Sequence, residues 1–71
     1  MRIGVIGCAG RMGRANLREI LETAGITLAG GVERAGSAAV GQDLGLLAGL
    51  EPAGVAATDD VTALVAAAQV V

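Results

Sequence analysis

The sequence predicts an α/β fold built on a parallel βαβ unit, and three features of the chain support this prediction. A short apolar run with β-branched residues opens the chain, a glycine-rich turn follows, and the apolar period then becomes helical. A second short apolar run comes after the helical stretch. Two strands joined by a helix normally lie parallel in one sheet. The chain is 54% apolar with a single proline, which excludes a disordered tail.

The first half of the chain contains a strand, a turn and an amphipathic helix. We expect a buried strand over Met1 to Ile6 and a glycine turn over residues 7–13. A helix is predicted from about Arg11 to Ala24, because Gly25 follows the last periodic residue. Arg18 and Glu22 form an i, i+4 pair on its polar face, next to Arg14. Its expected buried face consists of Gly13, Leu17, Ile20, Leu21 and Ala24.

After this helix the sequence predicts a strand over residues 26–32 and then a flexible, glycine-rich connection over about 35–54. We expect one helical turn around residues 44–50 in this connection, and Asp43 has no visible partner there. Residues 55–57 suit a short strand. Capping oxygens at residues 58–60 then introduce a second helix from Val61, and Val70-Val71 is typical of the start of another buried strand.

The composition excludes several classes of function. The net charge of −2 argues against a nucleic-acid partner. The chain has no His and no Lys, so histidine-based metal sites and Ser–His or Cys–His catalytic pairs are excluded within it, and we expect no metal site. One cysteine and no apolar run of membrane-spanning length favour a cytoplasmic protein without a membrane partner. At 71 residues with no aromatic side chain the core is thin, so we expect residues 1–71 to be the N-terminal part of a larger protein.

The turn carries the feature most informative about function. Gly7, Gly10 and Gly13 form the pattern G-x-x-G-x-x-G between a strand and a helix. In a dinucleotide-binding fingerprint the first glycine makes the tight turn, the second lets backbone approach a pyrophosphate, and the third lets helix and strand pack closely. Glu33 lies 20 residues beyond Gly13 (33 − 13 = 20), where the ribose-binding carboxylate is expected. The sequence therefore predicts a Rossmann-type nucleotide-binding domain.

Two arginines at the start of the first helix point to an anion independently of the glycines. Arg11 and Arg14 occupy the first turn, where acidic residues are normally favoured by the helix dipole, and no Ser, Thr, Asp or Asn caps the helix. A bound phosphate would supply the missing negative charge. The alternative is that both arginines simply point into solvent.

Glu33 and Arg34 together bear on the choice of cofactor. A carboxylate at the end of the second strand accepts hydrogen bonds from a ribose diol and favours NADH, whereas an arginine pairs with a 2′-phosphate and favours NADPH. The adjacent pair predicts tolerance of both, unless it is only a solvated surface ion pair. Cys8 and Met12 have no base beside them, so we expect Cys8 to pack as a small apolar residue, although the nearby helix N-terminus should lower its pKa.

The segment Arg2 to Gly13 resembles the start of 4-hydroxy-tetrahydrodipicolinate reductase, also called dihydrodipicolinate reductase. The Gly-Arg-Met-Gly core at residues 10–13 is more specific than the fingerprint glycines alone. Val32 to Ser37 is similar to the end of the family's second strand, and residues 41–43 with the Gly/Leu stretch after them are similar to its connecting segment. The resemblance covers essentially all 71 residues.

The resemblance implies a reductase of the diaminopimelate route to lysine, which transfers hydride from NADPH or NADH to a cyclic dicarboxylate and yields tetrahydrodipicolinate. It also implies a homotetramer and a C-terminal domain, absent from these residues, that binds substrate and carries a His-His and Lys catalytic motif. No catalytic residue is therefore expected in this chain. Glu33 would hold the ribose and Arg34 a 2′-phosphate, and the pyrophosphate cradle would comprise Gly7, Cys8, Ala9, Gly10, Arg11, Met12 and Gly13.

Two alternatives stay open on the sequence. One is another two-domain dehydrogenase of the same architecture, of the aspartate or homoserine dehydrogenase type. The other is a nucleotide-sensing module without chemistry.

Overall fold

A computed structural model describes all 71 residues and contains the parallel sheet that the sequence predicts. Its three strands lie in the order β2-β1-β3, and both pairings are parallel. Strand β1 spans Arg2–Ile6, β2 spans Thr27–Val32 and β3 spans Gln69–Val70. The two predicted strands in the first half are thus confirmed within a residue or two, and so is the strand at the end of the chain.

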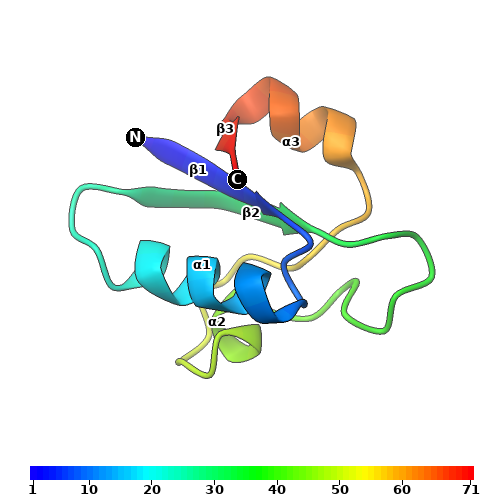
Figure 1. The fold of residues 1–71 in the computed structure, drawn as a ribbon, viewed down its shortest axis with the longest axis horizontal. Coiled ribbons are helices and arrows are strands. Elements are labelled where there is room, and N and C mark those ends of the chain that lie inside the picture. Colours follow the sequence, from blue (N-terminus) through cyan, green and yellow to red (C-terminus); the bar gives the residue numbers. More distant parts are fainter.

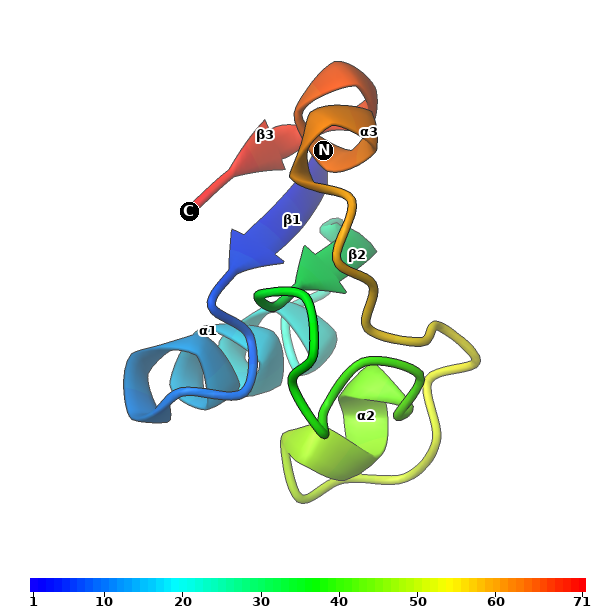
Figure 2. The ribbon, with the colours of Figure 1, turned by 90° about the vertical axis from the view of Figure 1, so that its right-hand side faces the viewer.

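Helices cover both faces of the sheet (Figure 1). Helix α1 (Arg11–Leu21) and the short helix α2 (Leu44–Leu47) lie on one face, and α3 (Val61–Ala67) lies on the other. The view in Figure 2 shows the sheet between these two layers. The single helical turn predicted within residues 44–50 is confirmed as α2. The arrangement is an α/β, Rossmann-type sheet.

The direction of winding reverses at β1. Helix α1 crosses one face and places β2 on one side of β1, while α3 crosses the other face and places β3 on the other side. In open parallel sheets, ligands bind beyond the carboxyl ends of the strands at such a reversal. The turn after β1, which starts at Gly7, lies at this position together with the N-terminus of α1.

The core between α1, α2 and the sheet is small but closed. Val5, Cys8, Leu17 and Leu44 are fully buried. Leu17 and Ile20 lie on the face of α1 predicted to be buried, because apolar residues at i and i+3 point to the same side of a helix. The core thus joins residues from the first and the second half of the chain.

The end of α1 differs from the prediction. The helix stops at Leu21 with Glu22 as its C-cap, and Ala24 lies exposed outside it. Gly25 adopts a positive φ of 86° in the turn that leads to β2. Placing Ala24 on the buried helix face was therefore wrong, because the chain needs these residues for the reversal into the next strand.

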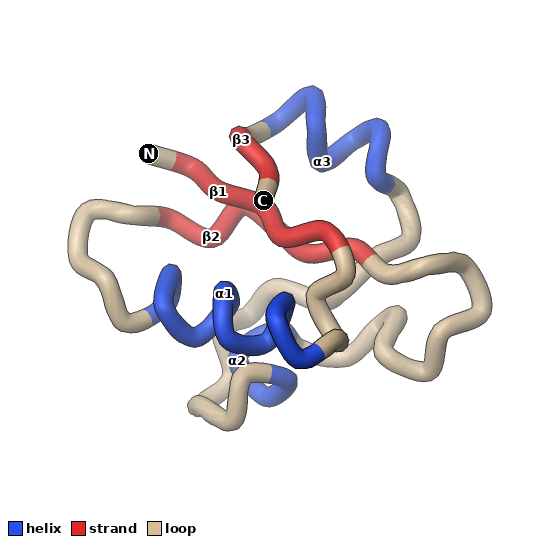
Figure 3. Tube along the Cα trace, viewed as in Figure 1, coloured by secondary structure: helices blue, strands red, loops and turns tan.

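The connection between β2 and α3 is mostly irregular (Figure 3). No strand forms at residues 55–57, where Ala56 makes a single isolated bridge to Asp43. Asp43 does have partners: its carboxylate accepts hydrogen bonds from the amides of Leu46, Ala53 and Gly54, at 3.1, 2.8 and 2.8 Å. The flexibility of this connection stays a prediction. No helix in the structure combines the length and the apolar character needed to cross a membrane.

Candidate functional site

The turn after β1 folds back over the end of β2. Gly7 has a φ of +72°, a left-handed conformation that favours glycine. The amides of Gly7 and Cys8 both donate to the carbonyl oxygen of Val32, at 2.9 and 3.2 Å. The tight-turn role predicted for Gly7 is confirmed, and the turn is fixed to the carboxyl end of the neighbouring strand.

Gly13 is required by the packing of α1 against this turn. A Cβ atom at Gly13 would overlap the carbonyl oxygen of Gly7 and would lie 2.8 Å from the Cα of Cys8. Both neighbours are backbone atoms, so neither can move aside cheaply. The predicted role of Gly13 in close packing between helix and strand is therefore confirmed.

Gly10 differs from the other two glycines because the fold does not need it. Its backbone is extended, with a φ of −73°, and a Cβ would meet only the carbonyl oxygen of Gly7 at an ordinary 3.4 Å. The space above this position is open to a group from outside the protein. A side chain at this position would extend into that open space.

The N-terminus of α1 has donors without acceptors. Gly10 caps the helix without a side-chain hydrogen bond, and no acidic residue lies in the first turn. The amides of Arg11, Met12 and Gly13 have no acceptor in the protein. Together with the open space above Gly10, these donors and the positive end of the helix dipole suit a phosphate group.

The arginines of the first turn do different things. Arg14 donates from Nε to the carbonyl oxygen of Ala9 at 2.8 Å, so it stabilises the turn as well as carrying charge. Arg11 is exposed and has no hydrogen bond or ion pair in the structure. The sequence suggested that these arginines either bind an anion or point into solvent. Neither interpretation predicted the hydrogen bond between Arg14 and the turn.

Glu33 is placed at the turn by a backbone contact. The amide of Ala9 donates to Glu33 Oε2 at 2.8 Å, which leaves Oε1 without a partner. Glu33 forms no ion pair with Arg34; the ion pair in the structure joins Arg18 and Glu22, at 3.4 Å on α1. The interpretation of Glu33 and Arg34 as a surface ion pair is therefore wrong. Glu33 links the end of β2 to the glycine turn instead.

An open pocket of about 340 Å³ lies at the carboxyl ends of β1 and β2. It contains Glu33 and Arg34 beside Gly7, so three of the sequence-predicted residues meet in one cavity. Part of its apolar wall is Ile6, the last residue of β1, which is 48% exposed. The residues that line it are Ile6, Gly7, Val32, Glu33, Arg34, Asp59 and Val61.

Cys8 and Met12 behave differently in the turn. Cys8 is fully buried and belongs to the core, as predicted. Burial raises the pKa of its thiol, and the charge of Glu33 raises it further. The pKa is therefore shifted upward, opposite to the lowering expected from the helix N-terminus, because burial disfavours the charged thiolate. Met12 is 74% exposed beside the free amides of α1.

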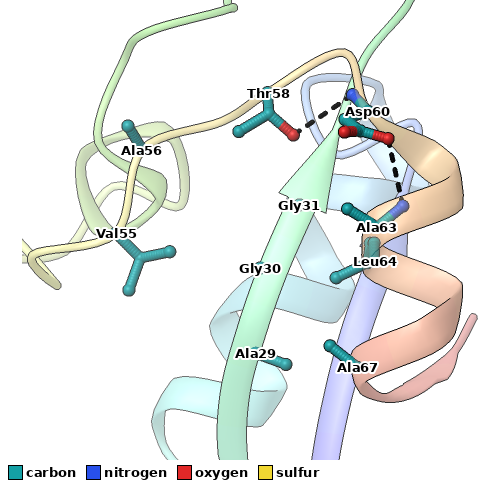
Figure 4. Close-up of a pocket in the computed structure, with 10 residues that line it drawn as sticks. All are labelled: Ala29, Gly30, Gly31, Val55, Ala56, Thr58, Asp60, Ala63, Leu64 and Ala67. Atoms are coloured by element: carbon teal, nitrogen blue, oxygen red, sulfur yellow. Dashed lines mark hydrogen bonds between the residues drawn. The ribbon is translucent and has the colours of Figure 1, made fainter.

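A separate pocket of about 200 Å³ lies between β2 and α3 (Figure 4). Its walls are mostly alanine, glycine and leucine, and the polar side chains at its rim are already engaged. Thr58 Oγ1 accepts from the amide of Asp60 at 3.3 Å, and Asp60 Oδ1 accepts from the amide of Ala63 at 3.0 Å. It holds none of the residues predicted to bind a cofactor, and its polar groups serve to begin α3.

Sequence reasoning missed one charged residue of the larger pocket, Asp59. It had been assigned to helix capping together with Asp60, but Asp60 alone makes the capping hydrogen bond. Asp59 lines the pocket that contains Glu33 and Arg34. Its position depends on a parallel bridge between Val32 and Thr58, which has no signature in the sequence.

The chain was compared with known protein families and with curated proteins. All of residues 1–71 match the family model described as dihydrodipicolinate reductase, N-terminus. A protein of Rhizobium meliloti named 4-hydroxy-tetrahydrodipicolinate reductase is 55% identical over 60 residues, covering 84% of this chain and 25% of the relative. Proteins of the same name from Anaeromyxobacter dehalogenans and Parvibaculum lavamentivorans are 50% and 54% identical over 70 and 66 residues.

These two matches cover 99% and 92% of this chain, and 26% and 24% of the relatives. The chain therefore spans about a quarter of the length of the curated relatives that it matches. The family resemblance seen in the glycine segment is confirmed over the full length of the chain. The chain belongs to the family described as dihydrodipicolinate reductase, N-terminus.

Proposed function

We propose that residues 1–71 form the NAD(P)H-binding portion of a 4-hydroxy-tetrahydrodipicolinate reductase. A bound nicotinamide dinucleotide supplies the hydride that reduces 4-hydroxy-tetrahydrodipicolinate to tetrahydrodipicolinate, a step in the diaminopimelate route to lysine. The observation that carries the proposal is Gly10, where the fold itself needs no glycine and free helix amides face open space. The family match and the names of the relatives support this reductase over an aspartate or homoserine dehydrogenase.

The pyrophosphate is held by backbone rather than by side chains. Amides at the start of α1 donate to its oxygens, and Arg11 and Arg14 add positive charge at the same end of the helix. Arg14 can do this while its Nε stays bonded to Ala9, because a guanidinium group has four further N–H donors. The cradle comprises Gly7, Cys8, Ala9, Gly10, Arg11, Met12 and Gly13.

The adenosine ribose lies over the end of β2. Glu33 Oε1 is free to accept a hydrogen bond from a ribose hydroxyl, while Oε2 keeps its bond to the amide of Ala9. Arg34, which is exposed and unpaired, meets a 2′-phosphate when NADPH binds. Because the two residues are adjacent, both NADH and NADPH are accepted.

The remaining machinery is supplied by residues outside this chain. The sequence has no His and no Lys, so we propose that the catalytic groups and the binding groups for the dicarboxylate substrate lie elsewhere in the protein. The complete enzyme is a homotetramer in the cytoplasm.

A binding measurement on the complete protein that contains residues 1–71 tests the cradle. Gly10→Val is expected to abolish saturable binding of both NADH and NADPH in calorimetric titration, because its side chain fills the space that the pyrophosphate needs. Ala15→Val is the matched control. It adds the same branched side chain at an exposed position one turn further along α1, and it should bind both nucleotides like the wild type.

Circular dichroism of each variant shows that the fold is kept. Tight NADH binding by a folded Gly10→Val protein would show that the pyrophosphate does not bind at the glycine turn. Arg34→Ala tests the other half of the site, since it should weaken NADPH about tenfold or more while NADH changes little. Equal losses of affinity for the two nucleotides would show that Arg34 does not bind the 2′-phosphate.

A further inference from the structure

The pocket at the ends of β1 and β2 contains one charged residue with no role so far. Its charged lining residues are Glu33, Arg34 and Asp59, two negative and one positive. Asp59 is exposed, and its carboxylate makes no hydrogen bond and no ion pair. Every other aspartate of the chain has a partner, since Asp43 and Asp60 each accept backbone amides. No hydrogen bond or ion pair of the fold therefore accounts for this carboxylate.

A backbone bridge brings the segment that carries Asp59 to the end of β2, where Glu33 lies. Val32 and Thr58 form a parallel bridge, in which the amide of Thr58 donates to the Gly31 carbonyl at 3.0 Å. The amide of Glu33 donates back to the Thr58 carbonyl at 2.8 Å. This bridge is isolated, and the residues that follow its two partners, Glu33 and Asp59, line the same pocket. The fold thus places a second carboxylate at the strand end where the ribose is proposed to bind.

The chemistry of the two cofactors differs at this place. The adenosine ribose of NADH offers a 2′-hydroxyl, which can donate a hydrogen bond to a carboxylate. NADPH instead carries a 2′-phosphate, with a charge of roughly −1.5 to −2 at neutral pH. Two carboxylates in an open pocket repel that phosphate, and the single guanidinium of Arg34 offsets only one of them.

We propose that Asp59 is a specificity-determining residue that disfavours NADPH relative to NADH. This inference rests on the proposed function, because it requires the adenosine ribose to bind over Glu33 and Arg34. Asp59 acts through its charge on the 2′-phosphate and makes no contact that NADH needs. The chain therefore accepts both nucleotides through Glu33 and Arg34, and Asp59 shifts the balance toward NADH.

The test is the ratio of the Kd of NADPH to that of NADH, measured by calorimetric titration of the complete protein. Asp59→Asn removes the charge and keeps the shape of the side chain. It should lower the ratio by about threefold to tenfold, a range expected for charges several ångströms apart in a solvated pocket. The whole change should come from tighter NADPH binding. Asp59→Glu keeps the charge and should keep the ratio near the wild-type value.

Two further measurements separate a local effect from a general one. Glu51→Gln makes the same change in net charge at an exposed site that lines none of the pockets, and it should leave the ratio unchanged. Raising the salt concentration should shrink the difference between Asp59→Asn and the wild type, because ions screen exposed charges.

Each other outcome overturns the inference. An unchanged ratio in Asp59→Asn would mean that the charge does not reach the 2′-phosphate. If Glu51→Gln changed the ratio of the two Kd values as much as Asp59→Asn does, the effect would come from the net charge of the protein and not from the position of Asp59. A loss of stability without a change in ratio would assign Asp59 to the start of α3 alone. If the wild type binds neither nucleotide saturably, the proposed function itself fails; if it binds both and only the ratio test fails, the proposed function stands without this inference.

Discussion

The packing of Gly13 against the glycine turn predicts that Gly13→Ala destabilises the protein, whereas helix propensity predicts that it stabilises the protein. Helix propensity alone says that Gly13→Ala should stabilise the protein by about 1 kcal/mol, because alanine is the better helix former. The structure says the opposite. A new Cβ would lie 2.8 Å from the Cα of Cys8 and would overlap the carbonyl oxygen of Gly7. Ordinary carbon contacts begin at about 3.5 Å, so the start of α1 must withdraw by roughly 0.7 Å or more.

The size of the effect follows from these opposing terms. Overpacking of this kind costs typically about 1–3 kcal/mol, and here the obstructing atoms are backbone, so the upper part of that range applies. After the gain in helix propensity, Gly13→Ala should lose about 1–2 kcal/mol of unfolding free energy.

Urea and thermal unfolding of the complete protein that contains residues 1–71, followed by far-UV circular dichroism, measure this loss. Gly10→Ala is the matched control in the same turn. Its Cβ meets only one atom, at 3.4 Å, and its φ of −73° suits any residue. Its loss should therefore be smaller than that of Gly13→Ala. A Gly13→Ala protein at least as stable as the wild type would refute the packing argument.

Two further predictions concern single residues of the connection and the core. Backbone hydrogen bonds, the strongest from Ala53, lower the pKa of Asp43; its contribution to stability is therefore full above the unfolded pKa of about 3.9 and is lost as pH falls through the lower folded value. Asp43→Asn should flatten the pH dependence of urea unfolding in this acidic range, whereas the charge-matched Glu51→Gln should keep the wild-type slope there. The buried thiol of Cys8, with its raised pKa, should react with a thiol reagent at least about 100-fold more slowly in the native protein than in urea. Fast native reaction would contradict the burial of Cys8, and an unaltered pH profile in Asp43→Asn would contradict the assigned cause.

Local patterns predicted the part of the fold that has short-range causes. The β-branched start, the helical period from Arg11 and the glycine turn are each dictated by neighbours within a few residues. For that reason β1, the start of α1 and the roles of Gly7 and Gly13 were predicted correctly. The end of α1 was misplaced, because the period alone does not show where the chain must turn to reach the next strand.

The sequence predicted residues of the candidate site, but not the contacts that hold them in place. Spacing from Gly13 identified Glu33, but nothing in the sequence indicated that its carboxylate bonds to the amide of Ala9. Asp43 looked like an isolated acid because its partners Ala53 and Gly54 donate backbone amides, and any residue except proline offers such a donor. Contacts to backbone leave no trace in side-chain patterns.

The sequence by itself determined the parallel α/β class, the glycine turn and the family, since these depend on residue types at short, fixed spacings. Only the tertiary structure decided which distant segments meet. The bridge between Val32 and Thr58 brings Asp59 to the pocket that Glu33 and Arg34 also line. The physical reason is that strand register is set by backbone hydrogen bonds, which every residue can make, and by burial of the whole sheet.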